Sequence, residues 1–291
     1  MALVSSSAGT TSGAPDFSLG SVNVDLTGRI YAPAVAQVDT PTVNFGIVRV
    51  CDVVTARTVS VGNSASGALT DTLTGNLTGG SVPFTAAGSF SGLAAGAGNS
   101  SALTVALNTA TAGVFCSNAA LAFTSQNPDL ADLNLPGGTV ALSAQVNRLA
   151  QAALAQIGGA GTLAGAGTSY TLNFGTYVEG SGSFAASLSL GNIAAAPADD
   201  LNGSFDLSGI GAGSAFTLVG FNGFNGFNGL AAGNSLAGGL SVSFTSGAPG
   251  SFDDVVVLRA AELAVRPSTG RYRTQETHQW VFKNLAVGLW E

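Results

Sequence analysis

Apolar and polar residues alternate in short stretches along most of this chain. Val22, Val24 and Leu26 alternate with polar residues, and stretches of the same period recur between clusters of Gly, Ser, Asn and Pro. A period of two places one side of each stretch in a core and the other in solvent, as in a half-buried β-strand. The pattern therefore predicts an all-β protein built from short strands and turns.

The predicted strands fall into two groups. Those of the first group are Val43–Arg49, Ala56–Val61, Leu69–Leu77, Val82–Thr85, Ala102–Leu107, Val114–Ser125 and Gly138–Val146. Those of the second group are Tyr170–Phe174, Phe184–Leu190, Leu201–Leu207, Ala215–Val219, Leu240–Phe244 and Phe252–Leu258. Short strands at turn-punctuated intervals are typical of a two-sheet, immunoglobulin-like sandwich, so each group is expected to form one.

One stretch occurs twice and marks the two modules. Residues 43–63 read VNFGIVRVCDVVTARTVSVGN, and residues 172–192 read LNFGTYVEGSGSFAASLSLGN. Both place an Asn-Phe-Gly triplet ahead of an alternating strand that ends in Gly-Asn. Further along, GLAAG occurs at residues 92–96 and again at 229–233. The repeated order of motifs predicts tandem sandwiches.

The repeated motif suggests fold-making roles for its residues. Phe45 and Phe174 are expected to plug the end of each sandwich, next to glycines that permit a bend. Asn63 and Asn192 are expected to hold the following loop through side-chain hydrogen bonds.

The segment before the first module is interpreted as a lead-in and a strand. Residues 1–40 are predicted to end with the last strand of a preceding repeat, because residues 22–38 are similar to residues 140–157, which close the first module. The first sandwich is then expected to cover residues 41–148.

The region between the modules is predicted to be an extended linker at residues 149–169, followed by the second sandwich at 170–260. Residues 148–156, RLAQAALAQ, have helical propensity. The similar stretch at 31–37 contains Pro33, which favours an extended conformation in both places.

Residues 261–291 form an atypical tail that holds both tryptophans, His278 and Lys283, the only histidine and lysine. Three interpretations remain open: a capping pair of strands, a partner-binding extension, or a frame-shifted or fused end. Without a seventh strand from this tail, the second sandwich is incomplete at its C-terminal edge, and exposed edge strands would favour self-association.

Taken together, these motifs resemble those of the choice-of-anchor D group of bacterial surface proteins, whose repeats are related to the immunoglobulin-like domains of the abnormal-spindle and hydin group. The resemblance is carried by residues 43–48 and 59–63 in the first module and by 172–175 and 188–192 in the second. It implies a secreted or surface-attached protein of tandem sandwiches, with no catalytic residues to transfer.

Composition narrows the classes of function. Charged residues make up 9% of the chain, the net charge is −7, and no basic stripe is present to neutralise the phosphates of a nucleic acid. No stretch is apolar enough for a membrane span, and the first residues lack the features of a secretion signal. We therefore expect an internal piece of a longer exported chain, outside the cell or on its surface, with other repeats of the same parent chain as partners.

No residue set predicts a reaction, a cofactor or a metal site. Asp199–Asp200 and Asp253–Asp254 are the only paired carboxylates, and neither lies in a loop with the oxygen ligands that calcium requires. The chain has no Gly-x-Ser-x-Gly motif, so no nucleophilic serine is predicted to form a catalytic triad with His278. The chain is expected not to be an enzyme.

Two candidate sites remain. Phe221, Phe224 and Phe227 recur at intervals of three in FNGFNGFNG, where they form either an exposed patch for a glycan or protein, or a duplicated loop packed on the sandwich. Cys51 and Cys116 are the only cysteines, and they allow either one disulfide or two free thiols.

The leading hypothesis is a non-enzymatic structural or adhesive repeat segment that serves as a stalk or spacer. One alternative is a glycan- or protein-binding module that uses the loop at residues 221–229. The other is an assembly unit that self-associates through exposed edge strands.

Overall fold

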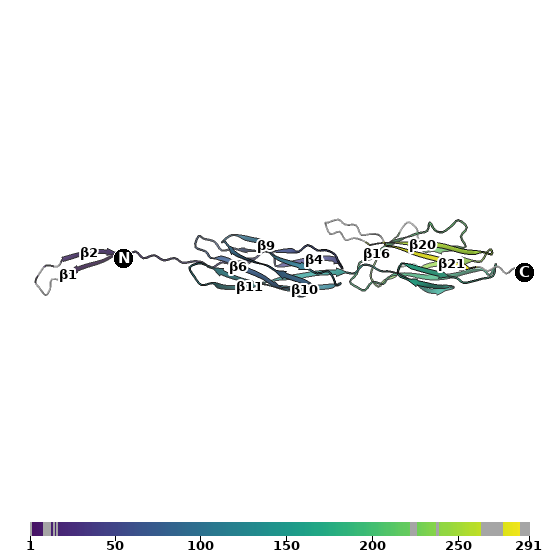
Figure 1. Ribbon diagram of the computed structural model, residues 1–291, viewed down its shortest axis with the longest axis horizontal. Coiled ribbons are helices and arrows are strands. Elements are labelled where there is room, and N and C mark those ends of the chain that lie inside the picture. Colours follow the sequence, from purple (N-terminus) through teal and green to yellow (C-terminus); the bar gives the residue numbers. More distant parts are fainter. Residues whose placement is uncertain are drawn as a thin grey trace.

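The regular structure of this protein consists of β-strands in two sandwiches that follow one another along a common axis, with a hairpin at the N-terminal side (Figure 1). A computed structural model describes residues 2–7, 13, 15, 17–221, 226–236, 239–262 and 276–285. Within these residues no helix is long and apolar enough to cross a lipid bilayer. The predicted all-β class and tandem sandwiches are confirmed.

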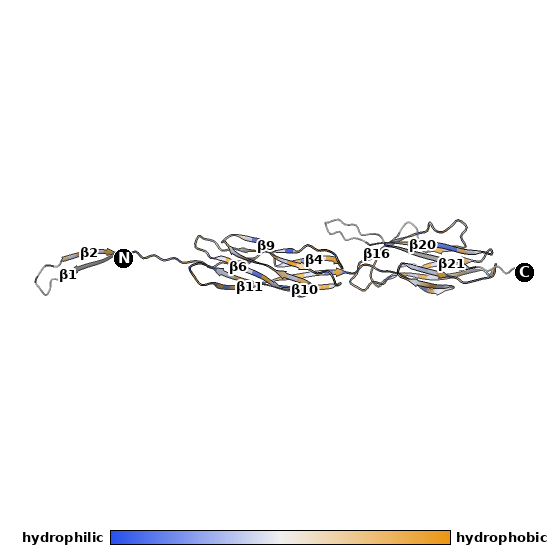
Figure 2. Cartoon of the chain, in the orientation of Figure 1, coloured by the Kyte–Doolittle hydropathy of each residue, from blue (hydrophilic) through white to orange (hydrophobic). Residues whose placement is uncertain are grey.

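The first sandwich packs a five-stranded sheet, ordered β4-β11-β10-β6-β8, against a four-stranded sheet, ordered β3-β5-β9-β7. Its strands are β3 (Ala36–Val38), β4 (Thr42–Arg49), β5 (Arg57–Asn63), β6 (Thr72–Gly79), β7 (Phe84–Ala87), β8 (Ser89–Leu93), β9 (Gly98–Leu107), β10 (Gly113–Gln126) and β11 (Leu133–Asn147). Alternation places one side of each strand in the core: Val59 and Val61 of β5 are fully buried. Figure 2 shows apolar and polar residues alternating along the strands of both sandwiches.

The second sandwich has sheets ordered β12-β15-β19-β17 and β13-β14-β21-β20-β16-β18. Its strands are β12 (Ala152–Gly159), β13 (Thr162–Ala166), β14 (Ser169–Asn173), β15 (Ser183–Asn192), β16 (Leu201–Asp206), β17 (Phe216–Val219), β18 (Phe227–Leu230), β19 (Leu240–Thr245), β20 (Ser251–Glu262) and β21 (Glu276–Leu285). Leu172, Leu188, Leu190 and Leu258 are among its fully buried core residues.

Two boundary predictions are wrong for the same reason. β3 pairs antiparallel with β5 inside the first sandwich, so residues 22–38 do not end with the last strand of an earlier repeat. β12 pairs in the same way with β15, so most of the expected linker at 149–169 is the opening part of the second sandwich. The similarity between residues 22–38 and 140–157 arises because both stretches contain the segment by which the chain enters a sandwich, β3 in the first and β12 in the second. It does not mark the last strand of a sandwich. The expected extended conformation of residues 148–156 is confirmed for the part within β12.

The tail supplies the strand that was missing from the second sandwich. β21 lies between β14 and β20, parallel to the first and antiparallel to the second. β11 has the same relation to β4 and β10 in the first sandwich. A ladder is made by backbone groups, so a strand of unrelated sequence can take this place. The expectation of an incomplete second sandwich is therefore wrong.

The N-terminal hairpin consists of β1 (Ala2–Ser7) and β2 (Phe17–Asn23), which pair with each other and with none of the other described strands. Residues 24–30 continue from it without regular structure, although the alternation around Val24 and Leu26 predicts a strand. A period-two segment becomes a strand only where a neighbouring strand completes its hydrogen bonds, and none of the described strands pairs with residues 25–30.

Candidate functional site

The two Asn-Phe-Gly triplets occupy equivalent places. Phe45 and Phe174 are both buried, and each packs against a phenylalanine of the opposite sheet at a ring-centroid distance of 6.1 Å. Gly46 and Gly175 follow with φ of 74° and 87°, a region that favours glycine. In each triplet the asparagine Oδ1 accepts a hydrogen bond from the glycine amide, at 2.8 Å in the first and 2.9 Å in the second. The predicted plug and bend are confirmed.

Asn63 is a buried hub of the first sandwich. Its Nδ2 donates to the backbone carbonyls of Asp71 (3.3 Å) and Leu93 (3.2 Å). Its Oδ1 accepts from the backbone amides of Val35 (3.1 Å) and Ala65 (3.3 Å). One amide side chain therefore joins the entering chain, two loops and strand β8, with its hydrogen-bonding capacity fully used.

Asn192 repeats this arrangement in the second sandwich. Its Nδ2 donates to the carbonyls of Asp199 and Leu230, both at 3.0 Å. Its Oδ1 accepts from the amides of Gln151 (3.0 Å) and Ala194 (3.3 Å). The predicted loop-holding role is confirmed for both asparagines, and Asp71 and Asp199 emerge as equivalent residues.

The carboxylate of Asp71 is satisfied within its own sandwich. Ser125 Oγ donates to one carboxylate oxygen and Asn127 Nδ2 to the other, each at 2.8 Å. Ser125 Oγ in turn accepts from the backbone amide of Ala34, also at 2.8 Å. This network closes the end of the first sandwich where the chain enters it.

The carboxylate of Asp199 instead binds the preceding sandwich. Arg49, the last residue of β4, forms an ion pair with it through Nε, and Asn147 Nδ2 of β11 donates to Asp199 Oδ1 at 2.8 Å. The ion-paired side chains are 22% and 12% exposed. The same structural position therefore closes one sandwich and joins the other to its neighbour.

Backbone hydrogen bonds complete this contact, which we call the junction: Arg49, Asn147, Arg148 and residues 195–199. The amide of Arg148 donates to the carbonyl of Pro197 at 3.0 Å, and the amide of Asp199 donates to the carbonyl of Arg148 at 2.9 Å. The Arg148 guanidinium also donates to backbone carbonyls of the same loop. The two sandwiches are thus joined by side chains and backbone without a free linker.

Of the three phenylalanines considered for an exposed patch, Phe221 is buried in the core of the second sandwich. Phe221 is 5% exposed and belongs to the core, where its ring contacts Phe205 at 5.0 Å. Phe227 is half-buried and packs against the same ring at 6.2 Å. Phe224 lies outside the described residues. Phe221 is therefore wrong as a partner contact, because burial in the core leaves its ring no exposed face.

The disulfide that was considered does not form, since Cys51 and Cys116 are both free and exposed. Cys51 lies in the loop after β4 and is the only non-glycine residue with positive φ in the described part of the chain, at 66°. Its amide donates to the carbonyl of Thr109 at 3.0 Å. Cys116 lies on β10, opposite Ser143 of β11.

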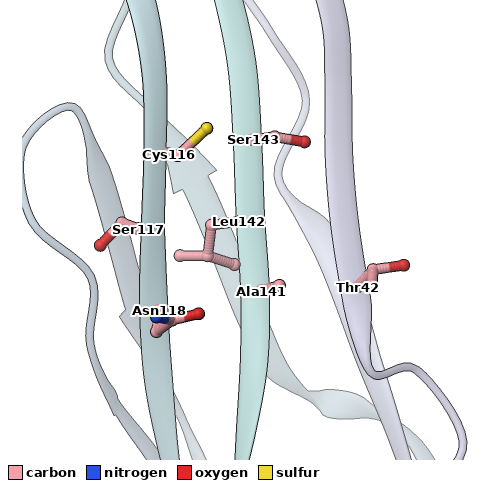
Figure 3. Close-up of a pocket in the computed structure, with 7 residues that line it drawn as sticks. All are labelled: Thr42, Cys116, Ser117, Asn118, Ala141, Leu142 and Ser143. Carbon is pink, nitrogen blue, oxygen red and sulfur yellow. The ribbon is translucent and has the colours of Figure 1, made fainter.

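A shallow pocket of about 350 Å³ lies on the outer face of the sheet formed by β4, β11 and β10 (Figure 3). The residues that line it are Thr42, Cys116, Ser117, Asn118, Ala141, Leu142 and Ser143. None of these side chains is charged, and the pocket brings together no acid, base and nucleophile.

One member of each carboxylate pair has structural partners. Asp199 belongs to the junction, and Asp254 accepts hydrogen bonds from Ser214 Oγ and from the amide of Gly211. Across the described residues no group of three or more His, Cys, Asp or Glu side chains is placed to hold a metal ion. His278 and Lys283 lie in β21.

The sequence matches no protein-family model and no curated protein. Among solved structures, the chain is similar to an ASH/PapD-like domain of human CEP192, with 9% identity, a TM-score of 0.30, and coverage of 44% of this chain and 96% of that one. It is also similar to a variant of CfaE, an adhesin of enterotoxigenic E. coli, with 8% identity, a TM-score of 0.33 and coverage of 91% and 90%. The D00-D0 domain of intimin matches with 12% identity, a TM-score of 0.23 and coverage of 85% and 99%.

Proposed function

We propose that this chain is a non-enzymatic structural segment, a stiff stalk or spacer of tandem immunoglobulin-like sandwiches. Its setting would be a secreted or cell-surface bacterial protein of the choice-of-anchor D type, in which other repeats of the parent chain continue the array. The observation that carries the proposal is the junction, in which Asp199 binds Arg49 and Asn147 of the preceding sandwich.

The mechanical argument starts from where this contact lies. A spacer transmits position only if neighbouring units keep a defined orientation, and a free linker would not provide that. At the junction the ion pair and the Asn147 hydrogen bond act together with backbone bonds on both sides of Arg148. Several bonds in different directions resist bending and twisting, even though one partly exposed ion pair contributes only up to about 1 kcal/mol.

The surface supports the same role. Charged residues are 9% of the chain, so hydroxyl and amide groups, rather than ions, are the main polar side-chain groups available to contact water. Such a surface keeps a long segment hydrated without strong attraction to cationic or anionic partners. Each sandwich has its own core, so the array can be extended unit by unit.

Small-angle X-ray scattering on the size-exclusion-purified monomer tests this proposal. The wild-type chain is expected to give the elongated distance distribution of the arrangement in Figure 1. Asp199→Ala should broaden that distribution towards bent shapes, because it removes the ion pair with Arg49 and the hydrogen bond from Asn147. Asp132→Ala, which removes an exposed carboxylate that accepts a hydrogen bond from Gln126 Nε2, is the matched control. A compact or freely bending wild-type monomer would refute the stiff spacer.

A further inference from the structure

The segment that enters the first sandwich has the pattern of a strand without a partner. We call residues 25–30, DLTGRI, the arm. Leu26 and Ile30 are 78% and 89% exposed, and they alternate with Asp25, Thr27 and Arg29. Figure 1 shows the chain between the hairpin and the first sandwich extended along the long axis, clear of both sandwiches. None of the described strands pairs with the arm.

Among the described strands, β4 is the terminal strand of its sheet, which leaves the first sandwich with an open edge there. The carbonyl of Pro41 accepts a hydrogen bond from the amide of Ala141 in β11, at 2.9 Å. Backbone groups of successive residues in a strand point to alternate sides, so those of Thr42 and Asn44 point to the open edge. An edge of this kind is a template for a further strand.

The second sandwich shows what such a strand looks like. There the equivalent edge, β14, is covered by β13, which pairs antiparallel with it. Leu163 lies opposite Leu172 and packs against the core. Gly165 lies opposite Tyr170 at φ 115°, and a Cβ at Gly165 would come within 2.3 Å of the carbonyl oxygen of Ser169. The cover strand thus uses a leucine followed, two positions later, by a glycine.

The arm carries the same pattern. Leu26 and Gly28 have the spacing of Leu163 and Gly165, each pair with one small residue between. In the register of β13, Leu26 would lie opposite Val43. The backbone groups of Thr27 and Asp25 would then meet those of Thr42 and Asn44, as the equivalent residues of β13 meet β14.

The arm cannot reach this edge in its own chain. Ala32 is held at the entrance of the first sandwich by its bridge to Thr70, and Leu26 lies six positions earlier, so Leu26 reaches at most about 20 Å from it. Val43 is paired with Leu142, opposite Ser117 of β10. Residue 125 of β10, beside the entrance, is eight positions from Ser117, about 26 Å away. The partner must therefore be another molecule.

We propose that the arm of one copy of this chain pairs antiparallel with the β4 edge of a second copy and so links two molecules. This inference goes beyond the spacer role, since a stiff spacer need not self-associate. The contact would combine main-chain hydrogen bonds with one apolar anchor, Leu26, which is how strand addition achieves affinity and register.

Sedimentation velocity over a concentration series, with reductant present to exclude disulfides, tests the contact. The wild-type chain should associate reversibly. Leu26→Asp should weaken association by about tenfold or more, because it places a charge where the apolar anchor sits. Thr42→Pro should do the same from the other side, because it removes the amide that faces the open edge.

Matched controls separate the pairing from general surface effects. Thr27→Asp adds the same charge on the solvent-facing side of the arm, and Thr42→Val keeps the amide; both should associate like wild type. Leu26→Asp changes a residue outside both sandwiches, so the melting temperature of this variant should equal that of the wild type. The Leu26→Asp result therefore tests the proposal even if Thr42→Pro disturbs the fold. A wild-type chain that stays monomeric, or an association unaffected by Leu26→Asp, would overturn the proposal.

Discussion

Arg49 and Asp199 are 150 positions apart in the chain and form an ion pair between the two sandwiches. The residue equivalent to Asp199 in the first sandwich, Asp71, binds Ser125 and Asn127 of its own sandwich instead. One position in the repeat thus serves two purposes, depending on what lies before it. This difference makes the junction specific to the order of the modules.

The junction pair should behave as a coupled pair. Asp199→Ala leaves Arg49 and Asn147 without this carboxylate and should destabilise the second sandwich by about 1–2 kcal/mol. The double variant with Arg49→Ala should cost less than the sum of the two single variants. Urea unfolding followed by tryptophan fluorescence measures the stability of the second sandwich selectively. Both tryptophans come after the first sandwich in the sequence, and Trp280 is part of β21. Strictly additive effects would contradict a direct contact.

Loss of either hub asparagine should be severe and local. Asn63→Ala removes four hydrogen bonds and leaves buried backbone groups unsatisfied, so it should cost roughly 3 kcal/mol in the first sandwich. Asn192→Ala should do the same in the second. Hydrogen exchange resolved by peptide should show faster exchange in only the mutated sandwich. Asn118→Ala, at an exposed position, is the control and should change stability by less than about 0.5 kcal/mol.

The glycines of the two triplets should be needed for backbone conformation alone. A Cβ at Gly46 or Gly175 would meet nothing within 4 Å, but both have positive φ. Alanine at either position should therefore cost about 1–2 kcal/mol through strain. Gly158→Ala is the control, since this glycine also has open space but no positive φ. Equal melting temperatures for Gly175→Ala and Gly158→Ala would show that strain is unimportant.

The buried end of the phenylalanine loop should matter for stability. Phe221→Ala opens a cavity beside Phe205 and should destabilise the second sandwich by about 3–5 kcal/mol. Chemical denaturation measures the loss, with Val53→Ala at a fully exposed position as the control. A change no larger than that of the control would place the Phe221 ring outside the core.

The strand pattern and the repeat could be predicted from sequence because both are local. Alternation around Val59 and Val61 assigns a buried side without knowledge of neighbours, and the Asn-Phe-Gly triplet needs only its own glycine to bend. The roles of Phe45 and Asn63 followed from residue type and place in the repeat. These features explain why the all-β class and the tandem arrangement were predictable.

Features that depend on distant partners were not predictable in this way. β21 takes the place of β11 without sharing its sequence, because a ladder joins backbone groups that every residue carries. The sequence of β12 predicts a linker, because no residue type or pattern within β12 indicates that it pairs with β15. Phe221 was ambiguous because its motif is the same whether the ring faces the core or solvent.

The amino-acid sequence by itself therefore determined the all-β class, which sides of the alternating strands are apolar, and that two similar units follow each other. Only the tertiary structure decided where each sandwich begins and ends, and that Asp199 binds the neighbouring sandwich whereas Asp71 does not. The alternation of apolar and polar side chains is a local property of each strand's own sequence. Hydrogen bonds and ion pairs between distant residues form only once folding has brought those residues together.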